Sequence, residues 1–535
     1  MKTMINSIIL ASCLALPLAS CSDSDVAPEQ KDWSTTTYFY SADAAMQDTY
    51  YKPTVGYVGD PMPFFDPVAG DFKVLYLQDF RPNPEGTYHP IWGVSTKDAA
   101  HYTALGELVS CGTLKSQDAA IGTGSTIYDE ASKLYYTFYT GNKYKPTGDE
   151  SAQAVMVATS ADFKTWTKDR TFLIKGQDFG YDKNDFRDPF VFKGDDGKFH
   201  MLISTKKGGK GSLAEFVSDD LKNWTDNGVF MTMMWDRFYE CPDLFKMGDY
   251  WYLVYSELHH AVRRVQYFKG RTLDELKACT ANDAGIWPDA HEGFLDSRGL
   301  YAGKTASDGT NRYLWGWCPT RSGKDNTAVG ASPAEPEWAG NLVCYKLIQH
   351  EDGTLTLGQV DAVSEKYNQD VAVEVKESQN MTEADGTYTL AGNVEQPDAY
   401  MLMGRLGSHN KISFTVTTSN KWDKFGISMV RGSDSKKYYT MVVNPEDENN
   451  RKVNFEEQGV EGKGFIAGID GYVFARPADN VYNVTIYTDN SICVMYINDV
   501  CSYTNRIYGI QKNCWSINSY NGANVKISNL KISQY

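Results

Sequence analysis

The sequence predicts an all-β protein, in which a five-bladed β-propeller is followed by a C-terminal β-sandwich. In the first part of the chain, strand-like runs recur about every 60 residues, which is the signature of a repeat architecture. Within that part, the segment Ser160–Trp166 is echoed 58 residues later by Ser218–Trp224. After residue 380, short segments of alternating polar and apolar residues are separated by Asn, Asp and Gly turns, as in a sandwich.

Residues 1–21 are expected to be a lipoprotein signal peptide. Lys2 supplies the positive end, and the apolar run 5–18 is too short to span a bilayer. The sequence Leu18-Ala19-Ser20-Cys21 resembles a bacterial lipobox, which predicts lipidation at Cys21. The polar stretch 22–35 is expected to be a flexible tether, and its acidic start resembles the export signal of Bacteroidetes surface lipoproteins. These features predict an exported outer-membrane lipoprotein, on the cell surface or the periplasmic side, that meets the membrane only through its lipid.

Composition excludes some partners and favours others. The net charge of −16 argues against nucleic acids and acidic membrane surfaces as partners. Aromatic residues make up 13% of the chain, which suits β-structure and also suits sugar-binding surfaces. None of the eight cysteines after Cys21 has a CxxC spacing, so a zinc site is not expected and most are interpreted as buried thiols.

The propeller is expected to span residues 36–362, with one strong strand in each of five blades. A polar landmark precedes each of these strands, and successive landmarks begin 62, 66, 52 and 56 residues apart. The innermost strand of each blade would bring its first residues to a common axis, where acids from blades one, three and four can meet. The strands are 73–77, 134–139, 200–204, 250–255 and 313–317, and the landmarks are Asp60, Gly122–Ser125, Asp188, Glu240 and Asp296.

Residues 363–380 are charged and without pattern, which predicts a linker. The sandwich is expected over residues 381–535, where alternating segments begin near 411, 425, 484, 493 and 525.

Three short segments in the propeller place a carboxylate beside a proline: Gly59-Asp60-Pro61, Arg187-Asp188-Pro189 and Glu240-Cys241-Pro242-Asp243. Proline lacks a backbone donor, so such an acid tends to lie where a strand ends or bends, with its side chain free. Two carboxylates, with a third to tune them, are the usual equipment for breaking a glycosidic bond. The sequence therefore predicts catalytic roles for Asp60, Asp188 and Glu240.

In this order, these segments resemble glycoside hydrolase family 32, which contains invertases, inulinases and levanases. The resemblance implies that Asp60 is the nucleophile, that Glu240 is the general acid and base, and that Asp188 stabilises the transition state. It implies a retaining cleavage of β-fructofuranosidic bonds in fructans such as levan and inulin, with no metal or cofactor. Environment must push the acidities of the two catalytic carboxyls apart, so Glu240 is expected in the less polar site.

Further segments resemble the same family and imply substrate contacts. Arg187 carries a fork of donors that can hold a carboxylate or a sugar hydroxyl, and Trp317 can stack on sugar. The first motif departs from the family's W-[MI]-N-D-P-N-G, because Tyr57–Pro63 keeps only the Asp-Pro pair, which implies an altered site around the fructosyl ring. The expected substrate-binding residues are Gln78, Trp92, Ser125, Arg187, Asp296 and Trp317.

Two alternatives remain open at this point. A five-bladed hydrolase of arabinan or arabinoxylan also uses three acids, but inverts the anomeric centre and holds its carboxyls farther apart. A surface glycan-binding protein without catalysis is the second alternative. For Glu240 a structural interpretation is also open, in which it forms a bridge by pairing with Arg187 or Arg237. The expected partner is an oligo- or polysaccharide, and the oligomeric state is not predicted.

Overall fold

The computed structural model describes residues 49–535 except 82, 234–237, 258–263, 280–291, 322–335, 431–437, 446–451, 459–471 and 508. The predicted signal peptide, the lipidated Cys21, the tether and Arg237 lie outside the described residues. Strands dominate the described chain, and its helical pieces are short: η2 (Gly176–Phe179), α2 (Leu273–Lys277) and α3 (Asp361–Lys366). None of the helices in this part of the chain is long and apolar enough to cross a membrane.

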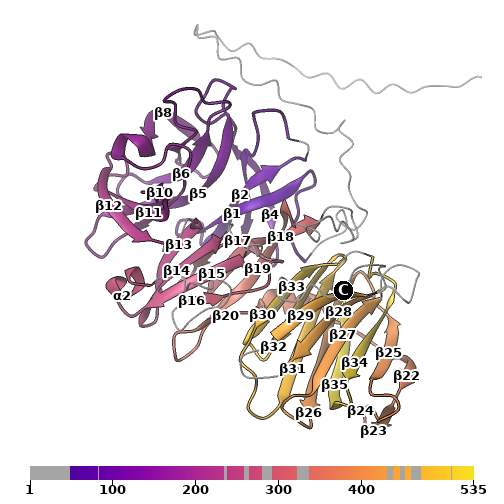
Figure 1. The fold of residues 1–535 in the computed structure, drawn as a ribbon. Coiled ribbons are helices and arrows are strands. Elements are labelled where there is room, and N and C mark those ends of the chain that lie inside the picture. The colour runs from indigo at the N-terminus through magenta and orange to yellow at the C-terminus, as the bar shows by residue number, and fades with distance from the viewer. Residues whose placement is uncertain are drawn as a thin grey trace, which may run out of the picture.

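Five four-stranded antiparallel units confirm the predicted propeller (Figure 1). Blade 1 is β1 (Tyr57–Asp66), β2 (Asp71–Asp79), β3 (Ile91–Thr96) and β4 (Thr103–Val109). Blade 2 is β5 (Ala120–Asp129), β6 (Leu134–Asn142), β7 (Gln153–Ser160) and β8 (Thr167–Ile174). Blade 3 is β9 (Phe186–Lys193), β10 (Phe199–Lys207), β11 (Lys210–Ser218) and β12 (Thr225–Thr232). Blade 4 is β13 (Glu240–Met247), β14 (Tyr250–Glu257), β15 (Arg264–Gly270) and β16 (Glu292–Phe294). Blade 5 is β17 (Tyr301–Ser307), β18 (Arg312–Arg321), β19 (Pro336–Gln349) and β20 (Leu355–Gly358).

The first strands of the five blades contact one another in a ring, β1 to β5 to β9 to β13 to β17 and back to β1. The circle is also closed by hydrogen bonds between β19 and β1, where Gly340 pairs with Val58. The strong runs seen in the sequence are the second strands, and the polar landmarks of blades 1 to 4 lie on the first strands. Apolar side chains from neighbouring blades fill the space between them, for example Phe138 and Phe186 between blades 2 and 3.

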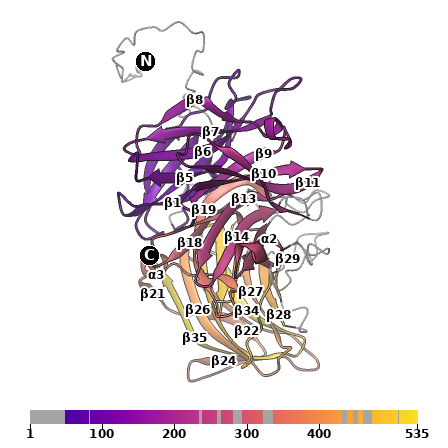
Figure 2. The ribbon, with the colours of Figure 1, turned by 90° about the vertical axis from the view of Figure 1, so that its left-hand side faces the viewer.

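The C-terminal domain is a sandwich of two antiparallel sheets (Figures 1 and 2). Its core is formed by inward-facing side chains of both sheets, such as Phe414, Ile486 and Trp515. One sheet has the order β23 (Met381–Ala384), β24 (Thr387–Ala391), β35 (Asn524–Gln534), β26 (His409–Thr418), β31 (Val481–Asp489), β32 (Ile492–Ile497) and β33 (Cys501–Arg506), with β21 (Gln369–Val371) also on β35. The other has the order β22 (Val375–Gln379), β25 (Ala399–Arg405), β34 (Cys514–Tyr520), β27 (Lys424–Val430), β28 (Tyr438–Asn444), β29 (Lys452–Gln458) and β30 (Tyr472–Val473).

The linker predicted over 363–380 is wrong, because this stretch belongs to the folded domains. It holds the end of α3, then β21, which pairs with β35, and β22, which pairs with β25. Both strands lie at the edge of the sandwich, and the residues of β22 at 376–378 are exposed. Because neither face of these strands is fully buried, their sequence lacks the alternation that marks a strand.

The two domains share one hydrophobic cluster. Tyr487, Val494 and Tyr496 of the sandwich pack with Tyr345 and Leu357 of the propeller in this cluster. The start of the described chain is tied to the sandwich as well, because the backbone N–H groups of residues 49 and 50 both donate to Asp489. The sandwich is therefore packed firmly against the propeller.

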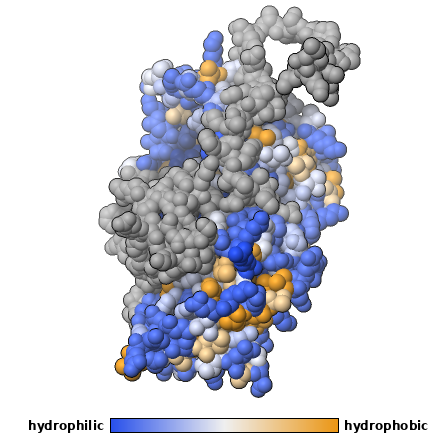
Figure 3. Space-filling view, turned by 90° about the vertical axis from the view of Figure 1, so that its right-hand side faces the viewer, coloured by the Kyte–Doolittle hydropathy of each residue, from blue (hydrophilic) through white to orange (hydrophobic). Residues whose placement is uncertain are grey.

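The eight cysteines after Cys21 are free thiols, six of them buried, as the sequence predicts. Among the coloured residues in Figure 3, hydrophilic ones predominate, and hydrophobic ones occupy a smaller area over the lower part of the molecule.

Candidate active site

A β-bulge interrupts the first strand of every blade. In β1, β9, β13 and β17 the register shifts over the same three-residue step, from Val58 to Pro61, Arg187 to Phe190, Glu240 to Asp243 and Tyr301 to Lys304. In β5 it shifts between Gly122 and Gly124. A bulge bends its strand and re-aims a side chain. The five bulges therefore meet where the first strands surround the axis, and three of them carry the predicted catalytic acids.

Asp60 lies in the bulge of β1 and is held by two donors. The hydroxyl of Thr123 donates to Oδ2 over 2.6 Å, and the indole N–H of Trp317 donates to Oδ1 over 2.9 Å. Burial raises the pKa of Asp60, the two donors lower it, and the charge of Glu240 raises it further. The donors come from blades 2 and 5, so both oxygens of this carboxylate are fixed in place.

Asp188 lies in the bulge of β9 and is almost completely buried. The backbone N–H of Cys241 donates to its Oδ2 over 2.9 Å, and its own N–H donates to the hydroxyl of Thr140 over 2.9 Å. Burial raises the pKa of Asp188 to about 7, against the opposing charge of Arg187. Its φ of 59° is in the left-handed region, which Asp tolerates better than most residues.

Glu240 begins β13 and is held by an ion pair and a hydrogen bond. Its Oε1 lies 3.0 Å from Nη2 of Arg187, and its Oε2 accepts a hydrogen bond from the hydroxyl of Tyr301. The guanidinium of Arg187 also pairs with Asp185 at 2.7 Å and lies over the ring of Phe238. The side chain of Glu240 stays 15% exposed, so a substrate can reach it.

The expectation that Glu240 lies in the less polar site is wrong. A cation and a phenol contact its carboxylate, whereas the two donors to Asp60, from Thr123 and Trp317, are both neutral. The pairing with Arg187 that the sequence offered as a structural role is present. The exposed remainder of Glu240 and its link to Tyr301 nevertheless keep it at the acid cluster.

Short contacts connect all three acids. Thr123, which donates to Asp60, also contacts the thiol of Cys241, whose backbone N–H bonds Asp188. On the other side, the rings of Tyr301 and Trp317 lie 5.4 Å apart and join Glu240 to Asp60. The structure therefore brings Asp60, Asp188 and Glu240 together, with Arg187 and Trp317 among them.

Ser125 has a structural place rather than the predicted contact with substrate. Its hydroxyl donates to the carbonyl of Pro189 and accepts from the N–H of Val191, both at 2.9 Å. These bonds use the hydroxyl to tie blade 2 to blade 3.

Gln78 and Trp92 have partners other than the three acids. Gln78 is fully buried on β2, and its side-chain nitrogen donates to the carbonyl of Val55 over 2.6 Å. Trp92 is on β3, the third strand of its blade, and packs against Phe80. Within the described residues, no hydrogen bond or ring contact joins either side chain to the acids, so a contact with substrate stays a prediction for both.

Asp296 is an anchor between the domains, not a residue of the site. It is fully buried and accepts hydrogen bonds from the hydroxyls of Ser502 and Thr504, the N–H of Thr504 at 2.8 Å and the N–H of Ser297 at 2.6 Å. Burial raises the pKa of Asp296 to about 6, while these donors lower it. The landmark of blade 5 is instead the bulge that begins at Tyr301, 61 residues after Glu240.

Lys304, in the fifth blade, is a buried cation that sequence reasoning missed. Its side-chain nitrogen donates to the carbonyl of Gly124 over 2.8 Å and lies over the ring of Phe190. Burial lowers the pKa of Lys304, and the nearby charges of Asp243, Asp188 and Asp60 raise it. Its positive charge therefore offsets part of the negative charge gathered at the axis.

Trp338, on β19, packs against Gly59, the residue before Asp60. Its ring stacks on His89 with the centroids 4.1 Å apart and the planes at 19°, and it also packs near Trp317. A methyl group at position 59 would overlap this indole, so only glycine fits before Asp60. The altered first motif thus has a physical cause, since Trp338 occupies the space that a side chain at 59 would need.

Family models match nearly the whole described chain. The model of the glycosyl hydrolases family 32 N-terminal domain matches residues 50–360, and that of the BT1760-like C-terminal domain of the same family matches residues 353–532.

Curated relatives are similar over part of their length. An insoluble β-fructofuranosidase isoenzyme of Arabidopsis thaliana is 26% identical over 319 residues, which cover 54% of this chain and 51% of the relative. A sucrose-6-phosphate hydrolase of Staphylococcus xylosus is 25% identical over 345 residues, which cover 61% of this chain and 65% of the relative. The matched part thus spans about half to two thirds of these relatives.

Solved structures share the fold over about nine tenths of the chain. The exo-inulinase of Aspergillus awamori superposes with a TM-score of 0.67 at 16% identity, over 93% of this chain and 99% of that one. The sucrose-6-phosphate hydrolase of Lactobacillus gasseri superposes with a TM-score of 0.66 at 19% identity, over 91% and 94%. Taken with the family models, the domain order and the three clustered acids, these likenesses show that the chain belongs to glycosyl hydrolase family 32.

Proposed function

We propose that this protein is a retaining glycoside hydrolase that cleaves β-fructofuranosidic bonds in fructans. The observation that carries the proposal is the acid cluster, in which a carboxylate with two fixed oxygens, Asp60, lies near a partly exposed one, Glu240. A fixed, ionised carboxylate suits attack on an anomeric carbon, and a reachable carboxyl suits proton transfer to a leaving group.

In the first step, an Asp60 oxygen forms a bond to the anomeric carbon while the bond to the leaving oxygen breaks, and Glu240 gives that oxygen its proton. In the second step, Glu240 takes a proton from water, the water oxygen bonds to the anomeric carbon, and Asp60 is released. Tyr301 and Arg187 orient Glu240 through their bonds to its two oxygens. Asp188 would hold sugar hydroxyls beside the reacting carbon.

Fructans are proposed as substrates because relatives point to them. One curated relative, 25% identical over 171 residues, is a fructan 6-exohydrolase of Beta vulgaris, and a solved relative is an exo-inulinase. Trp338 supports a sugar contact near Asp60, because its indole lies against Gly59 and beside Trp317, which donates to Asp60. Lipidation at Cys21 and export to the outer membrane remain proposals that labelling with a fatty acid and comparison with Cys21→Ala would test.

The deciding experiment incubates the protein lacking residues 1–21 with sucrose, inulin, levan and arabinan. We expect fructose or fructo-oligosaccharides, formed with retained anomeric configuration by NMR of the earliest product. Asp60→Asn and Glu240→Gln should each lower kcat by at least a thousandfold while leaving the circular dichroism spectrum unchanged. Release of arabinose with inversion would contradict the proposal, and so would an active Asp60→Asn variant.

A further inference from the structure

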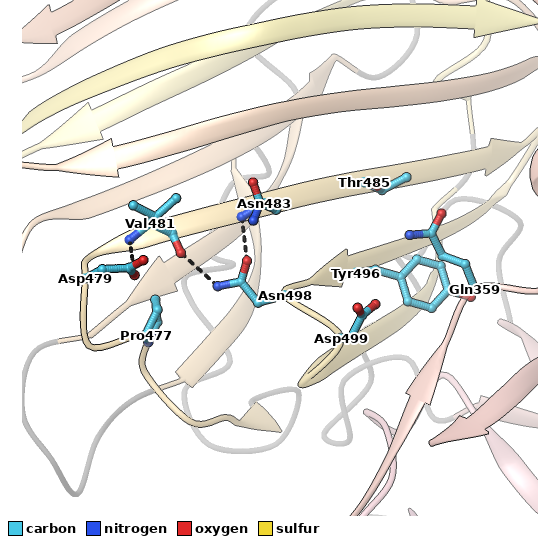
Figure 4. A pocket seen from close by; sticks show the side chains of 9 residues that line it. All are labelled: Gln359, Pro477, Asp479, Val481, Asn483, Thr485, Tyr496, Asn498 and Asp499. Carbon is cyan, nitrogen blue, oxygen red and sulfur yellow. Dashed lines mark hydrogen bonds between the residues drawn. The ribbon is translucent and has the colours of Figure 1, made fainter. Parts of the chain in front are cut away.

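A cavity of about 470 Å³ lies on the sandwich where it meets the propeller, and it shares no residue with the acid cluster. Three of its lining residues are consecutive outward-facing positions of β31, and the others come from three nearby turns and one neighbouring strand (Figure 4). The lining residues are Gln359, Pro477, Asp479, Val481, Asn483, Thr485, Tyr496, Asn498 and Asp499.

The floor of this cavity is a straight row of side chains. Val481, Asn483 and Thr485 follow one another along β31 in Figure 4, with Tyr496 and Gln359 beyond Thr485. Alternate residues of a strand lie roughly 7 Å apart on one face. The intervening Tyr482 and Val484 are buried in the sandwich core, so the row is fixed. The cavity is thus a groove that leads along β31 toward the domain junction.

The walls of the groove are also fixed, and both domains contribute to them. The side chain of Asn498 accepts from the N–H of Asn483 at 2.7 Å and donates to the carbonyl of Val481 at 2.8 Å. The carbonyl of Asp499 accepts from Thr356 of the propeller at 2.7 Å. Gln359 accepts a hydrogen bond from the hydroxyl of Tyr487 at 2.7 Å, which leaves its amide nitrogen toward the groove. A groove of this kind needs little reorganisation to bind.

Polar groups in the groove have hydrogen-bonding capacity to spare. Tyr496 is 96% buried, since its exposed fraction is 4%, yet it lines the groove. Within the described chain, the hydroxyl of Thr485 and the carboxylate of Asp499 have no hydrogen-bond partner, although both residues line the groove. Polar side chains that border a groove and lack an internal partner can find one in a ligand.

We propose that this groove is a second carbohydrate-binding site that holds a segment of the polysaccharide away from the acid cluster. Amides, hydroxyls and carboxylates together offer donors and acceptors, which is what neighbouring sugar hydroxyls require. Asp479 and Asp499 lie at opposite ends of the groove, so they disfavour an anionic ligand without forming a cation cage (Figure 4). The volume lies within the range of about 300 to 1,000 Å³ that is usual for small-ligand sites.

The identity of the polymer, a β-fructan, rests on the proposed function. The site itself would add affinity by multivalency, because a chain held at the groove raises the local concentration of its other segments near the axis.

The test uses the full mature chain with Glu240→Gln, so that the polymer is bound but not cut. Electrophoretic retardation in native gels with levan, inulin or arabinan gives the affinity. Thr485→Val removes one hydroxyl, and Thr485→Met fills the groove with an unbranched side chain. Thr417 is exposed on β26 of the same sheet and does not line the groove, so Thr417→Val and Thr417→Met are matched controls.

We expect the Thr485→Met variant to bind polymer at least tenfold more weakly, Thr485→Val to bind several-fold more weakly, and both controls to bind like the parent. In the active background, Thr485→Met should raise KM for the polymer several-fold and leave hydrolysis of sucrose or a short oligosaccharide unchanged. Equal binding of the Thr485 and Thr417 variants would overturn the site, and so would a parent that no polymer retards; the proposed activity would stand in both cases. If arabinan alone retards the parent, the Thr485 variants weaken it, and no β-fructoside is cut, then the site stands and the proposed activity fails.

Discussion

At the scale of single residues, the pair Gly59 and Trp338 shows how one contact shapes the site. The indole of Trp338 fills the space beside position 59, so a side chain there must displace it. Gly59→Ala should therefore cost about 1–3 kcal/mol of stability through overpacking and lower kcat/KM, because position 59 directly precedes Asp60. Trp338→Ala should also lower activity, but for another reason, since the indole that packs against Gly59 is removed.

The double variant separates these effects. Gly59→Ala with Trp338→Ala should be more stable than the sum of the two single changes predicts, because the clash is gone. Thermal unfolding and steady-state kinetics on all four proteins measure this coupling. Strict additivity would show that the two residues do not compete for one space.

Asp188 illustrates the cost of a buried functional acid. Its pKa is raised by burial to about 7, above the ordinary value of 3.8. Asp188 in the folded protein therefore binds a proton more tightly than in the unfolded chain. The contribution of this proton to the free energy of unfolding is fully present below about pH 4 and is lost as pH rises through 7. The Asp188→Asn variant has no ionisable group at this position and shows no such loss. Its free energy of unfolding, relative to that of the wild type, should therefore increase from pH 4 to pH 8 by on the order of 1 kcal/mol or more, while its activity falls.

Denaturant unfolding of both proteins at pH 4, 6 and 8 measures this difference. Asp220 is a useful control, because backbone donors from Asn223 and Lys222 lower its pKa to about 2. The Asp220→Asn variant should show a difference of the opposite sign. It should be less stable to unfolding than the wild type at neutral pH, and this difference should shrink only in strong acid. A pH-independent difference for Asp188→Asn would contradict the burial of its charge.

At the scale of elements, the repeat was visible in the sequence and the exact role of each landmark was not. The blade period and the three acids could be predicted, because proline beside an acid marks a strand irregularity wherever it occurs. The bulge at Tyr301 carries no acid and no proline, so the sequence points to Asp296 as the landmark of blade 5. Trp338 could not be assigned, because it reaches Asp60 only through the pairing of β19 with β1 across the closure.

The same reasoning failed for the supposed linker, and hydrogen exchange tests the difference. Residues 369–371 pair with β35, and residues 375–379 pair with β25, so their ladder amides are hydrogen-bonded. We expect these amides to exchange at least tenfold more slowly than an unstructured chain, because exchange requires local opening. Exchange at the unprotected rate across residues 369–379 would show a linker after all.

At the scale of the whole molecule, a buried arginine couples the two domains. Arg506 of the sandwich is 1% exposed and donates to the propeller carbonyls of Cys318 at 3.0 Å and Pro319 at 3.1 Å, and to the side chain of Asn341 at 2.6 Å. Asp296 of the propeller is held by the adjacent strand segment in the same way. The interface is thus built from paired polar groups in addition to the shared apolar cluster.

Arg506→Met should make the two domains unfold at different temperatures. The reason is that two or more buried acceptors lose their donor, at a cost of about 1–3 kcal/mol each. Calorimetry of the wild type is expected to show one cooperative transition, and the variant should show an earlier, broadened or split one. Arg405→Met, at an exposed arginine of β25, should leave the transition unchanged.

Removal of all residues after 368 should cause aggregation, because Tyr345 and Leu357 of the propeller lose their apolar cover. A soluble, active propeller alone would instead show that the sandwich serves binding and that the interface does not stabilise the catalytic domain.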